Sequence, residues 1–333
     1  MKHIIEGKPP AASWLEVDEN SAGQRLDNFL LRSLKGVPKT HVYRIIRSGE
    51  VRVNKCRSQA DARLEIGDMV RLPPVRVSDK VAEKTDNPAP PKEFPILFED
   101  EYLIALDKPA GVAVHGGSGV SFGVIEQLRR ARPQAKFLEL VHRLDRETSG
   151  ILLLAKKRSA LTNLQDQFRE RETGKTYLAL VVGQWPGNRK VLDKPLVKFL
   201  LPAADGLEGE RRVKVTSKDD PEGMKSVTLI KVVRKDDKFS LLEVTIKTGR
   251  THQIRVHLAS EGFPIAGDGK YGNFEINKAL QKQGLKRMYL HAWRLQFRHP
   301  AAGENDGRRQ ELQASPPTEL ETFFPVNATR YDL

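Results

Sequence analysis

Hydrophobic positions in the first part of the chain follow the period of a helix and then that of a strand. Val42, Ile45 and Ile46 stand at i, i+3 and i+4, which places them on one face of a helix. The Ser-Gly pair at 48–49 is typical of a helix end, and residues 51–54 alternate apolar with polar side chains. The pattern therefore predicts a helix and a strand that each bury one face only.

Longer apolar runs in the second part of the chain predict buried strands. Residues 103–106 read Leu-Ile-Ala-Leu and lead into a Lys-Pro-Ala-Gly turn at 108–111, and residues 151–155 are five apolar side chains in a row. Further strands are expected at 176–182, 241–246 and 295–297, and helices at 159–169 and 251–260. Because these elements do not alternate regularly, they predict a mixed fold rather than a doubly wound one.

Proline and polar residues indicate how the chain is divided. Residues 77–95 are polar and proline-rich, with no period that could bury a face, and we interpret them as a linker. We expect two domains with a tail at either end: an N-terminal tail at 1–20, a small domain at 21–76, a larger domain at 96–325 and a C-terminal tail at 326–333. Residues 187–223 are rich in Lys, Asp, Gly and Pro, which favours loops.

Charge favours a polyanionic partner. The 333 residues carry a formal net charge of +13, and residues 21–76 hold twelve Lys and Arg against five Asp and Glu, a net charge of +7. Lys and Arg that contact phosphates release counterions, so this charge suits RNA, DNA or an anionic surface. No apolar run approaches the roughly 18 residues that span a bilayer, and no signal peptide is evident, so we expect a cytoplasmic protein without a membrane partner.

One carboxylate among cations stands where a loop enters a buried strand. Asp145 lies in the stretch His-Arg-Leu-Asp-Arg at 142–146, which continues through Thr148-Ser149-Gly150 into the apolar run. An aspartate of ordinary acidity is ionised at neutral pH, which makes it a poor acid. Such a group can serve as nucleophile, as general base or as a salt-bridge partner, and the residues alone leave all three open.

Two other segments add groups suited to a cleft. Residues 249–257 combine a turn glycine, a helix start and cations on a partly apolar helix, and residues 175–177 place Tyr177 beside Lys175 at a strand start. An aromatic ring next to cations can stack on a base. The alternative is structural, since a strand tyrosine usually caps a core, and His252 and His257 are more often buried partners of other side chains.

The front segment resembles a known RNA-binding module. Residues 24–30, 49–54 and 66–68 are similar to the alpha-L (S-four-like) module first known from a small-subunit ribosomal protein. The resemblance implies that two helices and a small sheet hold folded RNA through its phosphates without reading its sequence. The cations that it implies as RNA contacts are Lys39, Arg44, Arg47, Arg52 and Lys55.

Residues 142–150 resemble the signature of the large family of RNA pseudouridine synthases that act on ribosomal and transfer RNA. Four more blocks fit the same family in order: Lys108–Gly111 with His115, Lys175–Tyr177, Thr248–Arg255, and Gly267-Asp268 with Tyr271-Gly272. The front module and residues 114–125 are most similar to members that modify bacterial large-subunit ribosomal RNA. The resemblance implies an α+β fold with a mixed, largely antiparallel sheet.

The resemblance also implies roles for four residues. Asp145 would be the carboxylate required to isomerise uridine, and Arg143 would enter the RNA stack in place of the flipped base. Tyr177 would stack on the uracil, and Arg255 would pair with Asp145. Whether Asp145 attacks the sugar, attacks the ring or removes a sugar proton stays open. Residues 223–228 depart from the family pattern, which leaves substrate contacts there undefined.

Other function classes fit less well. A serine hydrolase that used Ser149 with His142 and Asp145 is disfavoured, because Ser149 lacks the Gly-x-Ser-x-Gly elbow. A metalloenzyme that used His252 and His257 is disfavoured, because their five-residue spacing does not place both rings on one face of a helix. The single Cys56, expected to be half-buried, excludes an intramolecular disulfide and multi-cysteine zinc sites. The glycines at 117–123 do not match the dinucleotide-binding fingerprint, and those at 267–270 do not match the phosphate-binding loop. We therefore expect no nucleotide cofactor, and we also expect no metal.

The partner expected from the resemblance is large-subunit ribosomal RNA, naked or in an assembly intermediate, bound by a monomer. Two alternatives remain: a synthase that acts on transfer RNA, and a non-catalytic RNA-binding protein of ribosome assembly. An intact Asp145 beside Arg143, with Tyr177 and Arg255 present, favours an enzyme.

Overall fold

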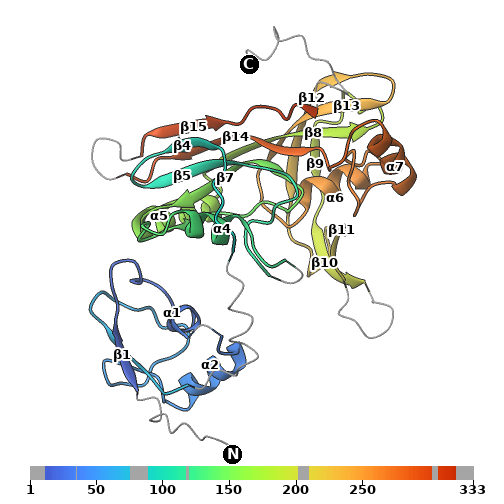
Figure 1. The fold of residues 1–333 in the computed structure, drawn as a ribbon. Helices are drawn as coiled ribbons and strands as arrows, with labels where there is room; N and C mark the ends of the chain where they lie inside the picture. The colour runs from blue at the N-terminus through green and yellow to red at the C-terminus, as the bar shows by residue number, and fades with distance from the viewer. Residues whose placement is uncertain are drawn as a thin grey trace, which may run out of the picture. The chain divides into compact units, whose positions relative to one another are not determined.

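The chain divides into two compact units, Met1–Pro90 and Pro91–Leu333 (Figure 1). The structure, a computed structural model, describes residues 12–34, 36–75, 89–117, 120–201, 210–301 and 307–319. The division falls within the segment interpreted as a linker, 77–95, most of which lies outside the described residues, as does the predicted C-terminal tail at 326–333.

The first unit packs two helices against a short antiparallel sheet. Its elements are β1 (Ser13–Glu16), α1 (Leu26–Ser33), α2 (Lys39–Arg47), β2 (Arg52–Val53) and β3 (Met69–Leu72), with the strands in the order β1-β3-β2. Val42, Ile45 and Ile46 of α2 are buried, as their spacing predicts. β1 lies inside the range predicted as the N-terminal tail. All four of its side chains are exposed, so no alternation marked it as a strand.

The second unit is built on one mixed sheet. Within the described residues it contains β4 (Ile96–Glu99), β5 (Leu103–Lys108), β6 (Glu139–Leu140), β7 (Ser149–Ala155), β8 (Gly174–Val182), β9 (Val191–Asp193), β12 (Val227–Lys235), β13 (Phe239–Ile246), β14 (Leu290–Arg298) and β15 (Arg309–Gln313). The order is β4-β5-β7-β14-β8-β13-β12-β9, with β6 beside β7 and β15 beside β14. The β7–β14 pairing is parallel and the others are antiparallel. The predicted α+β fold with a mixed, largely antiparallel sheet is therefore confirmed.

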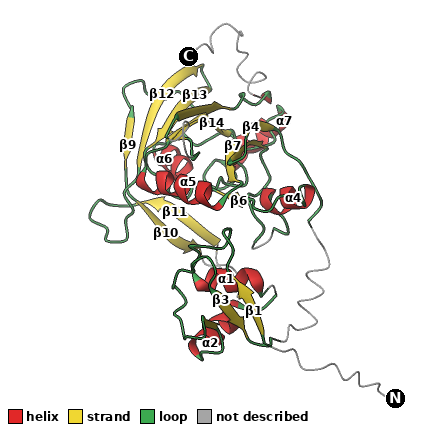
Figure 2. Cartoon of the chain, turned by 90° about the vertical axis from the view of Figure 1, so that its left-hand side faces the viewer, coloured by secondary structure: helices red, strands yellow, loops and turns green. Residues whose placement is uncertain are grey.

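Helices cover both faces of this sheet (Figure 2). They are α4 (Val124–Ala131), α5 (Arg158–Glu170), α6 (Gln253–Ser260) and α7 (Phe274–Lys282). α5 packs on the face of β7 that carries Ile151 and Leu153, and α4 shares a core with Leu152 and Leu154 on the opposite face. Every residue of β7 is buried, so the loop before it is attached to the centre of the unit. No helix among the described residues is long and apolar enough to cross a membrane.

A two-stranded hairpin stands apart from the main sheet. β10 (Leu196–Leu201) and β11 (Glu210–Val215) pair antiparallel, as Figure 1 shows. Together with β9, the hairpin places 15 of the 29 described residues in 187–223 in strands, so the prediction that this range lies mostly in loops is wrong for its described part; residues 202–209 lie outside the described residues. The hairpin exposes Lys198, Arg211 and Lys214. Because exposed charged residues are also typical of loops, the composition of these strands did not distinguish them from loops.

The lone cysteine also differs from expectation. Cys56 is exposed rather than half-buried. It follows a tight turn in which Asn54 and Lys55 both adopt positive φ, at 49° and 68°, and the turn holds the thiol at the surface.

Candidate active site

The loop that carries Asp145 is fixed to the core at its first residue. The ring of His142 stacks on Phe168 with the ring centroids 4.7 Å apart, and its Nε2 accepts a hydrogen bond of 3.1 Å from the backbone N–H of Leu153 in β7. Burial, and then the charge of Lys175, lower the pKa of His142 to about 4. The imidazole is therefore neutral at pH 7, which its role as an acceptor requires.

A buried lysine holds the same loop from the other side. The ammonium of Lys108 donates to three backbone carbonyls, those of Pro109 at 2.9 Å, Val112 at 2.7 Å and Arg146 at 3.1 Å. Its side chain is fully buried, and burial lowers its pKa to about 8. Lys108 thus ties the residue after Asp145 to the turn that follows β5.

Close packing fixes where the loop joins the sheet. Gly150 has a φ of +101°, and a Cβ there would lie 2.2 Å from the carbonyl oxygen of Ala292 in β14. Only glycine permits both the conformation and this approach. The parallel contact between β7 and β14 begins here, at Ser149 and Gly150, so the sheet register sets the position of the loop.

Asp145 is held by an arginine that a second aspartate holds in turn. Arg255 NH1 donates to Asp145 Oδ2 at 3.2 Å, while its Nε and NH2 each donate to Asp268 at 2.8 Å. Burial acts to lower the pKa of Arg255, but the hydrogen bonds and charge of Asp268, and then Asp145, outweigh it and raise the pKa. Asp268 is 1% exposed. Two carboxylates therefore share one guanidinium that stays charged.

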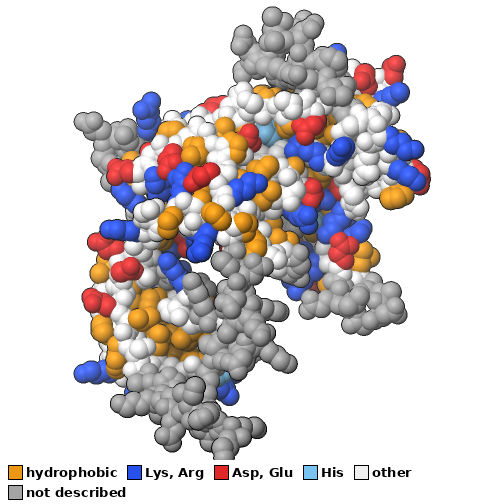
Figure 3. Space-filling model, in the orientation of Figure 1, with side chains coloured by type: hydrophobic (Ala, Val, Ile, Leu, Met, Phe, Trp, Pro, Cys, Tyr) orange, Lys and Arg blue, Asp and Glu red, His pale blue; other side chains and the backbone are white. Residues whose placement is uncertain are grey.

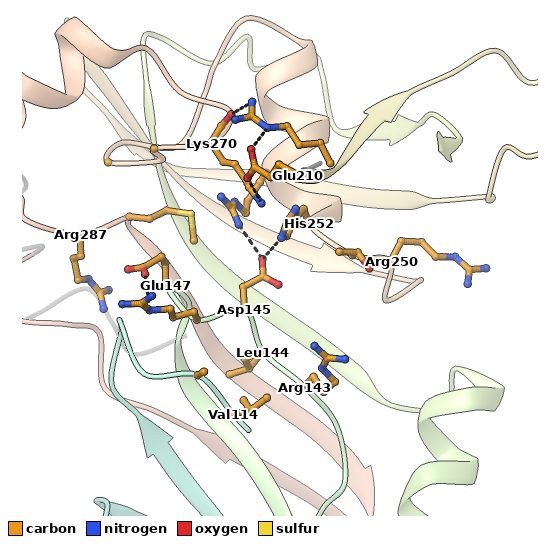
Figure 4. Close-up of a pocket in the computed structure, with 18 of the residues that line it drawn as sticks. Val114, Arg143, Leu144, Asp145, Glu147, Glu210, Arg250, His252, Lys270 and Arg287 are labelled. Carbon is orange, nitrogen blue, oxygen red and sulfur yellow. Dashed lines mark hydrogen bonds and ion pairs between the residues drawn. The ribbon is translucent and has the colours of Figure 1, made fainter. Parts of the chain in front are cut away.

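A histidine and a tyrosine complete the surroundings of Asp145. Figure 4 shows the His252 ring directed at the carboxylate, with Nε2 at 3.8 Å from Oδ2. On its other side His252 Nδ1 lies 2.8 Å from the hydroxyl of Tyr271, whose ring also faces the Arg255 guanidinium, with 5.1 Å from Cζ to the ring centroid. The carboxylate is thus surrounded on one side and open on the other.

Asp145 lies where two cavities adjoin. A large open cavity of about 900 Å³ is lined by Arg143, Arg146, Lys270 and Arg287 among others. A smaller one of about 100 Å³ has Tyr177, Ile254 and Leu290 in its wall. Asp145, Arg143, His252 and Arg255 line both. Lys and Arg side chains, blue in Figure 3, are scattered with Asp and Glu over the face of the second unit that this view shows.

The residues predicted for catalysis and substrate binding come together from three segments. Arg143 is exposed and lines both cavities, Tyr177 is half-buried in the smaller one, and Arg255 contacts Asp145. Burial, and then the charge of Asp145, raise the pKa of Tyr177, so its phenol is protonated at neutral pH. Arg146, next to Asp145 in the sequence, faces Glu147 and donates to the carbonyl of Gly111.

The predicted RNA-binding cations belong to the first unit. Lys39, Arg44 and Arg47 are exposed along α2, and Arg52 and Lys55 are exposed at and after β2. Arg44 lies 3.1 Å from the ring of His41, and Arg52 donates to the carbonyl of Lys55. Within the described part of this unit, none of the five forms an ion pair, so their charges face solvent.

Three residues that the structure places at the site were assigned no role there from the sequence. Lys108 was interpreted as part of a turn and His252 as a structural histidine, and Asp268 was named only as part of a block shared with the family. His252 adopts a left-handed backbone conformation, with φ 53° and ψ 20°, just before α6. No local pattern signals that conformation. The hydrogen bonds from Arg255 to Asp145 and from Lys108 to Arg146 span 110 and 38 positions.

Comparisons with known proteins agree with this arrangement. The sequence profile described as RNA pseudouridylate synthase matches residues 102–260, and that of the S4 domain matches residues 24–70. A protein of Yersinia pestis named ribosomal large subunit pseudouridine synthase C is 52% identical over 299 residues, which are 89% of this chain and 90% of that protein. Its namesake from Escherichia coli strain K12 is 50% identical over 306 residues, 90% of this chain and 93% of that protein.

Solved structures share the fold of about two thirds of the chain. Human RNA pseudouridylate synthase domain containing 4 is 27% identical and superposes with a TM-score of 0.55 over 68% of this chain and 90% of its own. Human RNA pseudouridylate synthase domain containing 1, at 24% identity, shares the fold with a TM-score of 0.53. The chain therefore belongs to the RNA pseudouridylate synthase family and is an enzyme of that class.

Proposed function

We propose that this protein isomerises specific uridines to pseudouridine in large-subunit ribosomal RNA, with Asp145 as the catalytic carboxylate. The observation that carries the proposal is the position of Asp145, held by Arg255 on one oxygen and open to both cavities. Relatives that are about half identical over nearly the whole chain bear the name of large-subunit synthases, which supports this RNA as the substrate.

The two cavities suit a strand and a base taken out of it. The larger one presents cations to a phosphate backbone, and the smaller one presents the ring of Tyr177 to a flat base. A uridine must leave its stack before the glycosidic bond can be reached, at a cost of a few kcal/mol. Arg143, which is exposed and lines both cavities, is placed to enter the stack and offset part of this cost.

The reaction needs a carboxylate and confinement. The bond between N1 and C1′ breaks, a bond between C5 and C1′ forms, and the hydrogen on C5 leaves as a proton while N1 gains one. No electrons are transferred to another molecule. The anion of Asp145 can act on the sugar or on the ring, and the walls around Tyr177 keep the detached uracil close for reattachment.

The first unit adds affinity rather than chemistry. Its exposed cations, Lys39, Arg44, Arg47, Arg52 and Lys55, would contact phosphates of folded RNA and bring the target near the second unit. The substrate is the RNA itself or an assembly intermediate, and the enzyme acts on it as a monomer in the cytoplasm.

Release of tritium tests the substrate. Transcripts of large-subunit ribosomal RNA and of transfer RNA, both made with uridine tritiated at C5, are incubated with the wild-type protein, because forming the new carbon bond must expel that hydrogen. Release from the large-subunit transcript alone is expected. Release from transfer RNA alone would contradict the proposed substrate but not the chemistry, and release from neither would contradict both.

A further inference from the structure

His252 has a left-handed backbone conformation, which residues other than glycine seldom adopt. Its φ of 53° lies in the left-handed region at the N-cap of α6. Holding a non-glycine residue there costs on the order of 1 kcal/mol, and such residues cluster where a side chain must be aimed. Here the conformation turns the ring into both cavities, edge-on to Tyr271, with the ring centroids 5.5 Å apart.

The hydrogen bonds of Tyr271 determine which ring nitrogen of His252 carries the proton. The hydroxyl oxygen of Tyr271 accepts from the backbone N–H of Val213 at 3.2 Å. Among the described residues, His252 Nδ1 at 2.8 Å is the acceptor available to the hydroxyl proton. A half-buried hydroxyl that already accepts one hydrogen bond donates to an acceptor within reach, so Tyr271 donates to Nδ1. The proton of the neutral imidazole then sits on Nε2.

Burial keeps this ring neutral. Desolvation lowers the pKa of His252, although the charge of Asp145 opposes it. Neutral His252 therefore presents an N–H, not a lone pair, to the carboxylate. Its Nε2–H is directed at Asp145, and the ring is not a base that could take the C5 proton.

Both donors near Asp145 face the same oxygen. Arg255 NH1 is 3.2 Å and His252 Nε2 is 3.8 Å from Oδ2, and Figure 4 shows both dashed lines ending on that atom. Oδ1 has no hydrogen-bond partner within the described part of the chain. It points away from both donors.

We propose that His252 is a positioning residue for Asp145: its Nε2–H, aligned by Tyr271, holds Oδ2 together with Arg255 and leaves Oδ1 as the oxygen that meets the uridine. The proposal rests on the proposed function, because it assumes that Asp145 acts on the substrate. The separation of 3.8 Å is longer than a hydrogen bond. The N–H closes on the carboxylate when bound RNA displaces water from the cavity, so the contact raises the rate of the chemical step rather than the affinity.

A matched pair of variants separates the donor from the ring. His252→Gln keeps an N–H donor at similar reach without the ring, and His252→Phe keeps the ring without a donor. The rate of tritium release is measured in a single turnover at saturating protein. We expect His252→Phe to lower this rate about 10- to 100-fold, which is the range for a hydrogen bond to a charged group. We expect His252→Gln to retain most of the wild-type rate. The Kd for RNA should stay within about twofold. If the His252 ring only packs against its neighbours, His252→Phe should release tritium faster than His252→Gln. That order, or equal rates for the wild type and both variants, would overturn the proposal.

Tyr271→Phe tests the alignment without changing His252. This variant keeps the ring against Arg255 and removes the hydroxyl that donates to Nδ1. It should slow release several-fold in the wild-type background and add no further loss to His252→Phe, because the two changes break one chain of hydrogen bonds. Losses that multiply would contradict the alignment, and so would a Tyr271→Phe protein that releases tritium at the wild-type rate. The second readout uses the single variant and stands even if the His252 variants fold poorly.

Asp145→Asn separates this inference from the proposed function. If Asp145→Asn is inactive while His252→Phe matches the wild type, the positioning role fails and the proposed function stands. If Asp145→Asn releases tritium at the normal rate, the proposed function fails and the inference fails with it.

Discussion

Asp268 grips the guanidinium of Arg255 with both carboxylate oxygens, through two hydrogen bonds of 2.8 Å from Nε and NH2. That leaves NH1 directed at Asp145. The Asp268 carboxylate also accepts from the backbone N–H groups of Lys270 and Tyr271, which fix its own orientation. The placement of Asp145 thus depends on a buried aspartate that does not touch it.

Replacing Asp268 should affect both stability and rate. Asp268→Asn leaves a buried guanidinium without its bidentate partner, and breaking a buried ion pair from one side costs about 3–5 kcal/mol. We expect urea unfolding to show a decrease in stability of that order and tritium release to slow, because Arg255 no longer holds Asp145 in one orientation. The matched control is Asp166→Asn, which breaks an exposed pair with Arg169 and should change stability by less than about 1 kcal/mol. Equal effects of the two variants would contradict the role of Asp268.

Lys108 should contribute to the placement of Asp145 through the backbone. Lys108→Met removes the donor shared by three carbonyls, including that of Arg146, and should destabilise the protein by about 1–3 kcal/mol because buried acceptors lose their partner. Release should slow as the loop loosens. Lys136→Met changes an exposed lysine by the same substitution and serves as the control. A Lys108→Met protein with the stability and rate of the control would refute the assignment.

His142 gives the protein a specific dependence on pH. Its pKa is about 4 in the folded protein, below the ordinary value of 6.5, so the unfolded chain binds this proton more tightly. The stabilisation is complete above about pH 6.5 and disappears as the pH falls toward 4, by about 3 kcal/mol in all. His142→Gln keeps an acceptor for Leu153 but does not titrate.

The difference between the two proteins isolates this residue from other histidines such as His291, whose pKa burial also lowers to about 4. Urea unfolding at about pH 7 and about pH 4.5 should show wild type losing more stability than His142→Gln. Identical decreases in stability would mean that His142 is not buried in its neutral form.

Two exposed arginines of α2 should set part of the salt dependence of RNA binding. Replacing Arg44 and Arg47 together with Ser should weaken binding and reduce the slope of log K against log salt by about 0.7–0.9 for each phosphate that the protein no longer binds. Replacing Lys278 and Lys282 of α7 with Ser removes the same charge from exposed positions outside the predicted RNA contacts. Filter binding over a range of salt compares the two. If the Arg44 and Arg47 variant showed the same slope as the Lys278 and Lys282 control, these arginines would not contact RNA phosphates.

Individual helices and strands could be predicted from the sequence where their apolar residues follow a regular pattern. The spacing of Val42, Ile45 and Ile46 predicted the buried face of α2, and the apolar run at 151–155 predicted a fully buried strand. These features depend on neighbours within a few residues, where periodicity is informative. The hairpin β10–β11 was missed because only three of its twelve side chains are buried and its charge resembles that of a loop.

The geometry around Asp145 depended on contacts that no local pattern encodes. Pairing of Arg255 with Asp145 was expected only through resemblance to a family, and the two lie 110 positions apart. The bidentate partner Asp268 and the left-handed His252 are products of how α6 and the turn after it pack together. A buried Lys108 is also against the usual distribution of lysine, which is rarely fully buried without partners.

The most direct test of the account is single-turnover tritium release by Asp145→Asn on large-subunit ribosomal RNA, with the Kd for the same transcript measured alongside. The amide keeps the size of the side chain and removes its charge. We predict that release is abolished while the Kd stays close to that of the wild type, because RNA affinity comes from cations elsewhere. Release at the normal rate would contradict the assignment of Asp145 as the catalytic carboxylate.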